Sequence, residues 1–160
     1  MRVLVTGSNG FIGKNLVLLL NQDTSVETVF FTRENNVEDF PKMLEGVDWV
    51  FHLAGVNRSK NKEDFFLGNT ELTVKLCNAI RKNGRLISVV YASSIQASQA
   101  NNYGKSKRAA EKALIKLRDD MAIPVYIYRL KNIFGKWARP DYNSVVATFC
   151  YNLARNLPIK

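Results

Sequence analysis

Residues 6–13, Thr-Gly-Ser-Asn-Gly-Phe-Ile-Gly, decide the fold of this chain of 160 residues. They follow a short β-branched run, Val3 to Thr6, which predicts a strand. They also begin a stretch, Phe11 to Leu20, in which apolar residues recur at helical spacing. A turn of the form Gly-x-x-Gly-x-x-Gly between a strand and a helix is typical of a βα unit that binds a dinucleotide.

Each glycine of this turn has a distinct physical role. Gly7 permits the tight turn out of the strand, Gly10 leaves room for backbone to approach a pyrophosphate, and Gly13 allows the helix to pack closely on the sheet. The helix N-terminus then offers free N–H groups and a positive partial charge to the phosphates. The alternative is a glycine-rich turn that binds nothing. The predicted contacts to the cofactor in this turn are Gly7, Asn9, Gly10, Phe11, Ile12 and Gly13.

Apolar runs alternate with helix-like stretches along the rest of the chain. Further strands are expected at 27–32, 48–53, 86–91 and 124–130, and helices at 37–44, 69–82, 103–117 and 144–156. This alternation predicts an α/β protein with a Rossmann-type doubly wound parallel sheet, as one domain over residues 1–160. The strands are nearly all apolar, so we expect them to be buried on both faces.

Composition narrows the classes of function. Apolar residues make up 46% of the chain, and the net charge is +9. The basic residues are scattered and not interleaved with stacking aromatics, which argues against nucleic-acid binding and fits attraction of an anionic nucleotide. No apolar run reaches the ~20 residues of a membrane span, and the N-terminus lacks the features of a signal peptide. We therefore expect a cytoplasmic protein with no membrane partner.

Cysteine and histidine content argues against two further kinds of site. Cys77 and Cys150 lie far apart without metal-like spacing, and we expect free thiols rather than a disulfide. His52 is the only histidine, which argues against a multi-histidine metal site and a histidine-based triad. We therefore expect no metal.

The end of the second predicted strand bears on the choice of cofactor. Enzymes that prefer NAD usually place Asp or Glu there, on the ribose hydroxyls, whereas this chain has Arg33, about 20 residues after the glycine turn. A guanidinium binds a 2′-phosphate bidentately, and a carboxylate would repel it. Arg33 therefore favours NADPH. Glu34 could serve the ribose, which keeps NAD open, and a solvated surface arginine is the other interpretation.

A Ser/Tyr/Lys set follows the fourth predicted strand. Tyr103 and Lys107 lie four residues apart at the start of a helix, soon after Ser94, so their side chains reach one site. Reduction of a carbonyl needs a proton donor, and a nearby ammonium should lower the pKa of a phenol from about 10. We predict Tyr103 as the acid, Lys107 as its activator and Ser94 as a hydrogen-bond partner of the same oxygen, with hydride from the cofactor. A helical surface pair is the alternative for Tyr103 and Lys107.

With these motifs the chain resembles an extended short-chain dehydrogenase/reductase, a group that acts mainly on nucleotide sugars. The resemblance also rests on His52-Leu53-Ala54-Gly55, on Asn69 opening the next helix, and on residues 128–135, Tyr-Arg-Leu-Lys-Asn-Ile-Phe-Gly. It implies that His52 is structural and that Ser93 is less suited than Ser94 to the catalytic role. It also implies contacts to the cofactor from Leu53, Ala54, Gly55, Asn69, Tyr103 and Lys107, and to the substrate from Arg58, Ser94 and Asn132.

Residues 52–58, 93–97 and 134–152 are similar to the reductase domain of a subgroup of capsular-polysaccharide and O-antigen enzymes. This subgroup implies NADPH-dependent reduction of the 4-keto group of a UDP-linked 2-acetamido-2,6-dideoxy sugar, a step toward UDP-N-acetyl-L-fucosamine. Its members continue into a substrate lobe and a cupin domain. The resemblance therefore implies a fragment with the substrate lobe largely missing, some apolar surface uncovered, and pairing as a homodimer through the helices near Asn69 and Tyr103.

Two other functions stay open at this point. A nucleotide-sugar epimerase with tightly held NAD uses the same Tyr103 and Lys107, and a non-catalytic protein would bind NADPH without turnover. A 4,6-dehydratase is disfavoured, because that subgroup has Asp-Glu directly after the serine or threonine, where this chain has Ile95 and Gln96.

Overall fold

Parallel strands form a single sheet in the computed structural model, which describes residues 1–142 and 144–159. Residue 143, within the resemblance over 134–152, and residue 160, the end of the expected domain, lie outside the described part. The strands in chain order are β1 (Arg2–Thr6), β2 (Glu27–Phe31), β3 (Trp49–His52), β4 (Ser88–Ser94) and β5 (Val125–Leu130).

The strand order across the sheet is β2-β1-β3-β4-β5, and every pairing is parallel. Val3 of β1 pairs with Thr28 of β2 on one side and with Trp49 of β3 on the other. The order therefore reverses between β1 and β3. In open α/β sheets, ligands bind in the crevice outside the carboxyl ends of the strands at such a reversal.

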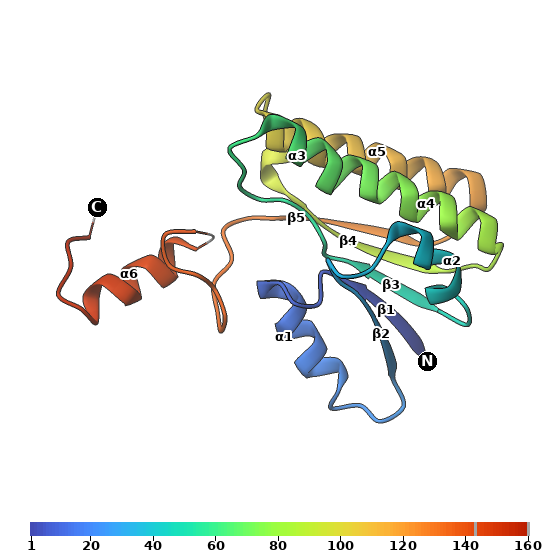
Figure 1. Cartoon of the computed structure of the whole chain (residues 1–160), viewed down its shortest axis with the longest axis horizontal. Coiled ribbons are helices and arrows are strands. Elements are labelled where there is room, and N and C mark those ends of the chain that lie inside the picture. The colour runs from blue at the N-terminus through green and yellow to red at the C-terminus, as the bar shows by residue number, and fades with distance from the viewer. Residues whose placement is uncertain (143, 160) are drawn as a thin grey trace.

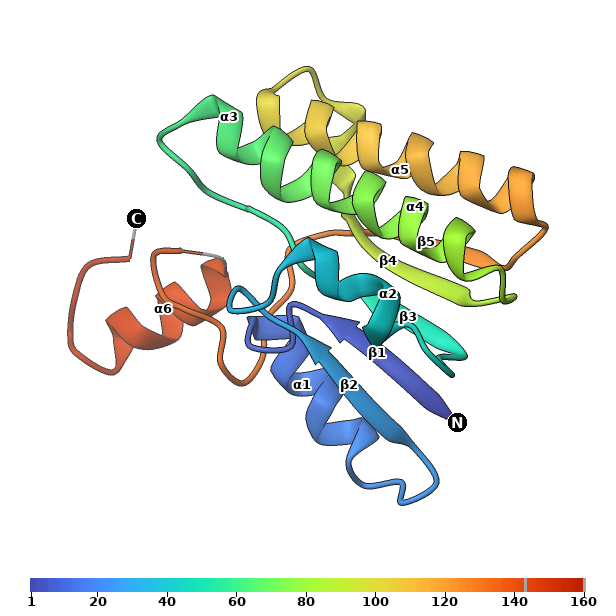
Figure 2. The same cartoon turned by 45° about the vertical axis from the view of Figure 1, so that its right-hand side comes forward.

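Helices lie on both faces of this sheet (Figure 1). One face carries α1 (Phe11–Leu20). The other carries α2 (Phe40–Met43), α4 (Leu72–Asn83) and α5 (Asn102–Met121), and Figure 2 shows α4 and α5 side by side. The short α3 (Lys62–Phe65) leads into α4, and α6 (Val145–Leu153) lies apart from the sheet (Figure 1). The predicted Rossmann-type α/β fold is confirmed.

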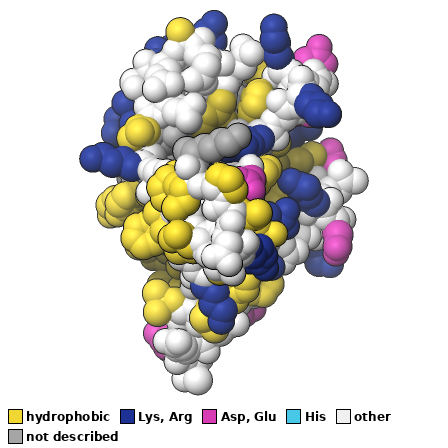
Figure 3. Space-filling model, turned by 90° about the vertical axis from the view of Figure 1, so that its left-hand side faces the viewer, with side chains coloured by type: hydrophobic (Ala, Val, Ile, Leu, Met, Phe, Trp, Pro, Cys, Tyr) yellow, Lys and Arg dark blue, Asp and Glu magenta, His cyan; other side chains and the backbone are white. Residues whose placement is uncertain are grey.

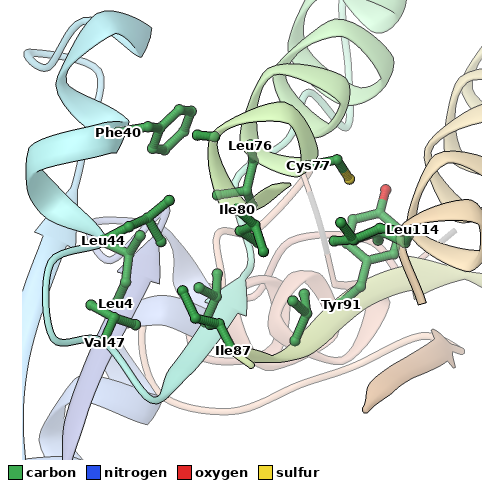
Figure 4. Packing of buried hydrophobic residues seen from close by; sticks show 14 of the residues in the cluster. Leu4, Phe40, Leu44, Val47, Leu76, Cys77, Ile80, Ile87, Tyr91 and Leu114 are labelled. Atoms are coloured by element: carbon green, nitrogen blue, oxygen red, sulfur yellow. The ribbon is translucent and has the colours of Figure 1, made fainter. Parts of the chain in front are cut away.

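The main core lies between the sheet and helices α2, α4 and α5. Apolar side chains from these helices meet those of the strands there (Figure 4). The fully buried side chains of this core come from strands, from helices and from the turns beside them. They include Leu4, Phe40, Leu44, Leu76, Ile80, Ile87 and Leu114. Because these positions repeat every three or four residues in α4 and α5, burial of one apolar stripe fixes both helices against the strands.

The opposite face of the sheet is only partly covered, so the expectation of strands buried on both faces is wrong for β5. Its residues alternate between half-buried and exposed, and Tyr126 and Tyr128 are 46% and 57% exposed. Trp49 stacks on Tyr126 with ring centroids 5.9 Å apart. On this face α1 packs against β1, where Val3 and Val5 are fully buried. It does not reach β5, which lies at the far edge of the sheet (Figure 2).

Two helices differ from their expected ranges. The stretch expected at 37–44 is a 3₁₀ turn, Val37–Asp39, followed by α2, which carries a proline in its first turn. The helix expected at 69–82 begins earlier, because Asn61 caps α3 by accepting a hydrogen bond from the Glu63 N–H. A π-helical segment, Phe66–Glu71, then joins α3 to α4. Asn69 therefore lies inside this segment and does not open a helix.

Candidate active site

The glycine turn packs tightly against the end of β3. Gly7 has a φ of +73°, and a Cβ there would lie 2.7 Å from the Ala54 nitrogen. A Cβ at Gly13 would lie 2.2 Å from the Gly7 carbonyl oxygen. Among the described residues, α1 has no side-chain cap and no acidic residue in its first turn, so its first N–H groups are free for an anion. This cradle fits the pyrophosphate of a dinucleotide.

A buried histidine ties the glycine turn to the helical layer. The Thr73 hydroxyl donates to the Asn69 carbonyl (2.6 Å), so it accepts from His52 Nε2 (2.8 Å). The other ring nitrogen, Nδ1, then accepts from the Thr6 hydroxyl (2.7 Å), whose oxygen accepts from the Ala54 N–H (3.1 Å). Burial, with a smaller contribution from the charge of Lys107, lowers the pKa of His52 to about 3. His52 is thus a neutral structural residue, as the resemblance implies.

Asn69 fixes the segment that follows β3. Its Oδ1 accepts from the Val56 N–H (2.9 Å), and its Nδ2 donates to the Val56 carbonyl (3.0 Å) and to the Ser106 hydroxyl (2.9 Å). A Cβ at Gly55 would lie 2.5 Å from Asn69 Oδ1 and 3.3 Å from Lys107 Nζ. The buried Asn69 amide is therefore bonded to protein on both its atoms, and it shapes the crevice by holding the backbone around Gly55.

Ser94 and Tyr103 meet at the carboxyl end of β4, which extends to Ser94 rather than ending at Tyr91 as expected. Ser94 lies beside the Tyr103 phenol, and the Tyr103 ring packs edge-on against Phe65. The sequence predicts that a neighbouring ammonium lowers the pKa of Tyr103. In the structure this pKa is raised, because burial of the phenol outweighs the hydrogen bond with Ser94.

Lys107 lies one turn further along α5 and is almost fully buried. Its ammonium donates to the Ala92 carbonyl (2.9 Å) and lies 4.8 Å from the centroid of the Tyr91 ring. Burial lowers the pKa of Lys107 to about 8, and the charge of Glu111 opposes this shift. The side chain is therefore mostly protonated at neutral pH.

The sequence does not predict a hydrogen-bond network that surrounds a buried carboxylate beside Lys107. Glu111, on the next turn of α5, is 4% exposed and accepts hydrogen bonds from Ser93 and, through both carboxylate oxygens, from Arg129. The available signal was the four-residue spacing from Lys107, which places Glu111 on the same helix face. Ser93 is engaged here, whereas Ser94 Oγ accepts from the Gln96 N–H (3.2 Å) and lies beside Tyr103.

Three other predicted residues, Arg33, Arg58 and Asn132, are exposed at the rim of the crevice at the carboxyl ends of the strands. Arg33 is exposed in the turn after β2, where the Asn35 side chain accepts from the Thr32 N–H (2.8 Å). Arg58 donates to the Asp141 carbonyl (3.2 Å), and Asn132 is exposed after β5. Within the described part of the chain, neither Arg58 nor Asn132 hydrogen-bonds the Ser/Tyr/Lys set.

The loop before α6 is tied to both sides of this rim. Asn15 of α1 donates to the Lys136 carbonyl (2.9 Å), and Arg58 lies 5.7 Å from the Tyr142 ring centroid. Figure 3 views this side of the molecule and has hydrophobic side chains beside Lys and Arg side chains. Such a surface suits a ligand that is partly apolar and negatively charged.

The cysteines, the metal-ligating side chains and the helix lengths can also be compared with the sequence analysis. Cys77 is buried, Cys150 is exposed, and both are free. The described residues contain no group of three or more His, Cys, Asp or Glu side chains arranged to hold a metal ion. None of the helices in residues 1–142 and 144–159 is long and apolar enough to cross a membrane.

Comparison with known proteins identifies relatives over the whole chain. The family described as "NAD dependent epimerase/dehydratase family" matches residues 3–160. A curated Pseudomonas aeruginosa protein, "UDP-2-acetamido-2,6-beta-L-arabino-hexul-4-ose reductase", is 56% identical over all of this chain, which spans 43% of that protein. The crystal structure of the capsular polysaccharide assembling protein CapF from Staphylococcus aureus matches with a TM-score of 0.84 and 40% identity, over all of this chain and 43% of CapF.

A more distant structure supports the fold alone. UDP-glucuronic acid 4-epimerase from Bacillus cereus, solved in complex with NAD, matches with a TM-score of 0.87 at 21% identity, over 99% of this chain and 65% of that one. The chain thus spans less than half the length of the reductase and of CapF.

Proposed function

Because the chain belongs to the NAD dependent epimerase/dehydratase family, we propose that it is the dinucleotide-binding part of an NADPH-dependent reductase. The proposed reaction reduces the 4-keto group of a UDP-linked 2-acetamido-2,6-dideoxy-hexulose, in the synthesis of capsule or O-antigen precursors toward UDP-N-acetyl-L-fucosamine. The name of the 56% identical Pseudomonas protein supports this substrate class. We propose a cytoplasmic enzyme without nucleic-acid or membrane partners.

The observation that carries this proposal is that Ser94, at the end of β4, lies beside the Tyr103 phenol, with the buried ammonium of Lys107 one helical turn further along α5. These three side chains lie at the carboxyl edge of the sheet, and a Cβ at Gly55 would lie 3.3 Å from Lys107 Nζ. A carbonyl at this position would meet a hydroxyl pair and a fixed positive charge, which is what the developing alkoxide of a reduction requires.

Each residue has one role in the proposed mechanism. When bound, the nicotinamide cofactor supplies hydride to the carbonyl carbon. Tyr103 is held as a neutral phenol by its burial, so it has a proton to donate to the carbonyl oxygen. Ser94 holds the phenol hydroxyl and the same oxygen by hydrogen bonds, and Lys107 stabilises the tyrosinate that remains. The residues that would hold the cofactor are those of the glycine turn, the 53–55 segment, Arg33 and Lys107.

The proposal also includes a homodimer formed through α4 and α5. Val74 and Ile115 lie on these helices and are 39% and 38% exposed, although both are apolar. Burying such positions against a second copy would stabilise the pair. Sedimentation equilibrium measures this state directly.

The test of the proposed function begins with titration of the 160-residue chain with NADPH and, separately, with NADH, followed by cofactor fluorescence. Saturable binding with NADPH preferred supports the proposal. Loss of NADPH absorbance on addition of the UDP-linked 4-keto sugar, with formation of the 4-hydroxy product, supports the reaction. Absence of binding of either dinucleotide to the folded chain would contradict the proposed role of this part of the protein.

The change Arg33→Ala tests the preference for NADPH. We expect it to weaken NADPH binding by about tenfold or more and to leave NADH binding nearly unchanged, because a charge-assisted hydrogen bond to a phosphate contributes about 1.5–3 kcal/mol. The measurement is the same fluorescence titration. Arg118→Ala is the matched control, because Arg118 is an exposed arginine near the far end of α5. Equal losses for both cofactors would mean that Arg33 does not contact the 2′-phosphate.

A further inference from the structure

The ammonium of Lys107 is buried, and few neighbouring groups offset its positive charge. Its hydrogen bond to the Ala92 carbonyl and its position over the Tyr91 ring orient it without neutralising it. The titratable side chains that interact with it are His52 of β3, Tyr91 of β4 and Glu111 of α5, and Tyr103 lies one turn before it on α5. His52 and the two tyrosines are uncharged at neutral pH, so Glu111 is the anion of this set.

Glu111 is built to stay ionised at this place. Arg129 of β5 donates from Nε to Oε1 (3.0 Å) and from Nη2 to Oε2 (2.7 Å), and the Ser93 hydroxyl donates to Oε1 (2.5 Å). Burial alone would raise the pKa of Glu111, but the hydrogen bonds from Arg129 and Ser93 outweigh it and lower the pKa. Arg108 adds a further favourable charge.

We propose that Glu111 is a positioning residue that keeps the Lys107 side chain in its ammonium form, with Arg129 and Ser93 holding the Glu111 carboxylate in place. The geometry supports this because Lys107 and Glu111 are one helical turn apart, both nearly fully buried, on the same face of α5. Without the carboxylate, the neighbours that remain are His52, Tyr91 and Tyr103, which are uncharged at neutral pH and do not offset the burial of the ammonium. The inference deepens the proposed function, because the reduction uses Lys107 as a cation.

The network also joins the two strands that carry the edge of the site. Ser93 precedes the proposed active serine in β4, and it pairs with Arg129 of β5 in the sheet register. Glu111 therefore bonds to both members of one cross-strand pair, while its own helix carries Tyr103 and Lys107. A change at Glu111 consequently bears on the charge of Lys107 more directly than on the position of the strands, which are also held by the ladder between β4 and β5.

The test is the titration of the Lys107 side chain by NMR, in the 160-residue chain without cofactor. The variant Lys107→Arg assigns the signal, and we expect a midpoint near pH 8 in the unmodified chain. Glu111→Gln keeps the size and hydrogen-bonding groups of the side chain but removes its charge. We expect this change to lower the Lys107 midpoint by about one pH unit or more, because a close opposite charge shifts a pKa by about 1–3 units.

The direction of the shift separates this role from structural damage. If the change merely loosened the site, water would reach Lys107 and its midpoint would rise toward the ordinary value of about 10.4. Asp119→Asn is the matched control, since it removes a negative charge from the exposed far end of α5 and should leave the midpoint unchanged. An unchanged or raised midpoint in folded Glu111→Gln would overturn the inference.

A second variant serves if Glu111→Gln fails to fold. Ser93→Ala removes one hydrogen bond to the Glu111 carboxylate and changes no charge, so the Lys107 midpoint should fall, while Ser93→Thr keeps the hydroxyl and should leave the midpoint near its original value. A midpoint that does not fall in folded Ser93→Ala would overturn the inference. Because no step needs cofactor or substrate, the titration gives its answer even if the chain proves unable to reduce a keto sugar.

Discussion

Replacing Tyr103 with phenylalanine is expected to reduce the rate of keto-sugar reduction by about 10²–10⁴-fold, while NADPH binding stays nearly unchanged. The substitution removes the proton donor and keeps the ring, whose edge packs against Phe65. Because the lost hydroxyl lies half-buried beside Ser94, the free energy of unfolding should change by no more than about 1 kcal/mol. The rate is measured as NADPH consumption with the UDP-linked 4-keto sugar.

Tyr126→Phe is the matched control for this experiment. Tyr126 is 46% exposed on the sparsely covered face of β5, so the loss of its hydroxyl should leave both rate and binding unchanged. Turnover that survives in Tyr103→Phe would exclude the proposed acid role. A parallel loss of NADPH binding would instead mean that the phenol holds the cofactor.

The second large effect is expected from Gly13→Ala. A Cβ at this position would lie 2.2 Å from the Gly7 carbonyl oxygen and 2.7 Å from the Ser8 Cα, and both are backbone atoms of the turn itself. The turn must therefore shift, which should lower the free energy of unfolding by about 1–3 kcal/mol and abolish binding of both cofactors. Denaturant unfolding and fluorescence titration measure the two effects.

Gly10→Val distinguishes damage to the fold from obstruction of the cofactor. Gly10 has a φ of −77°, which any residue adopts, and a Cβ there meets only the Gly7 oxygen, at 3.1 Å. We expect this variant to unfold at nearly the same denaturant concentration as the unmodified chain and to bind neither NADPH nor NADH, because its side chain fills the space of the pyrophosphate. Retained binding would mean that the pyrophosphate does not approach Gly10.

The order of strands and helices could be predicted because each apolar run and glycine turn is a local signal. The range 11–20 was obtained for α1 without error, since the glycine turn defines its start. The beginning of the helix before Asn69 was missed because charged residues 62–64 interrupt the apolar spacing there, and no sequence pattern marks a π-helical segment. The exposure of β5 was also missed, since an apolar strand does not say whether a helix covers it.

The residues of the candidate site also fall into two groups, those that local sequence spacing brings together and those that only the packing of the fold brings together. Neighbours in sequence, such as Tyr103 and Lys107, could be placed together from helix geometry. The contacts of Glu111 with Ser93 and Arg129 join a helix to two strands, so they depend on how α5 packs on the sheet. The pKa of Tyr103 was expected to fall because charge is visible in a sequence, whereas the burial that raises it is not.

The stacked pair of Trp49 and Tyr126 gives the sparsely covered side of the sheet an intrinsic fluorescent reporter. The chain has two tryptophans, and the second, Trp137, lies in the loop at the rim of the crevice. Substituting Trp137 would therefore leave an indole whose emission wavelength and quenching by acrylamide report on the wetting of this face alone. In the chain without cofactor, the indole emission then reports on whatever packs against β3 and β5.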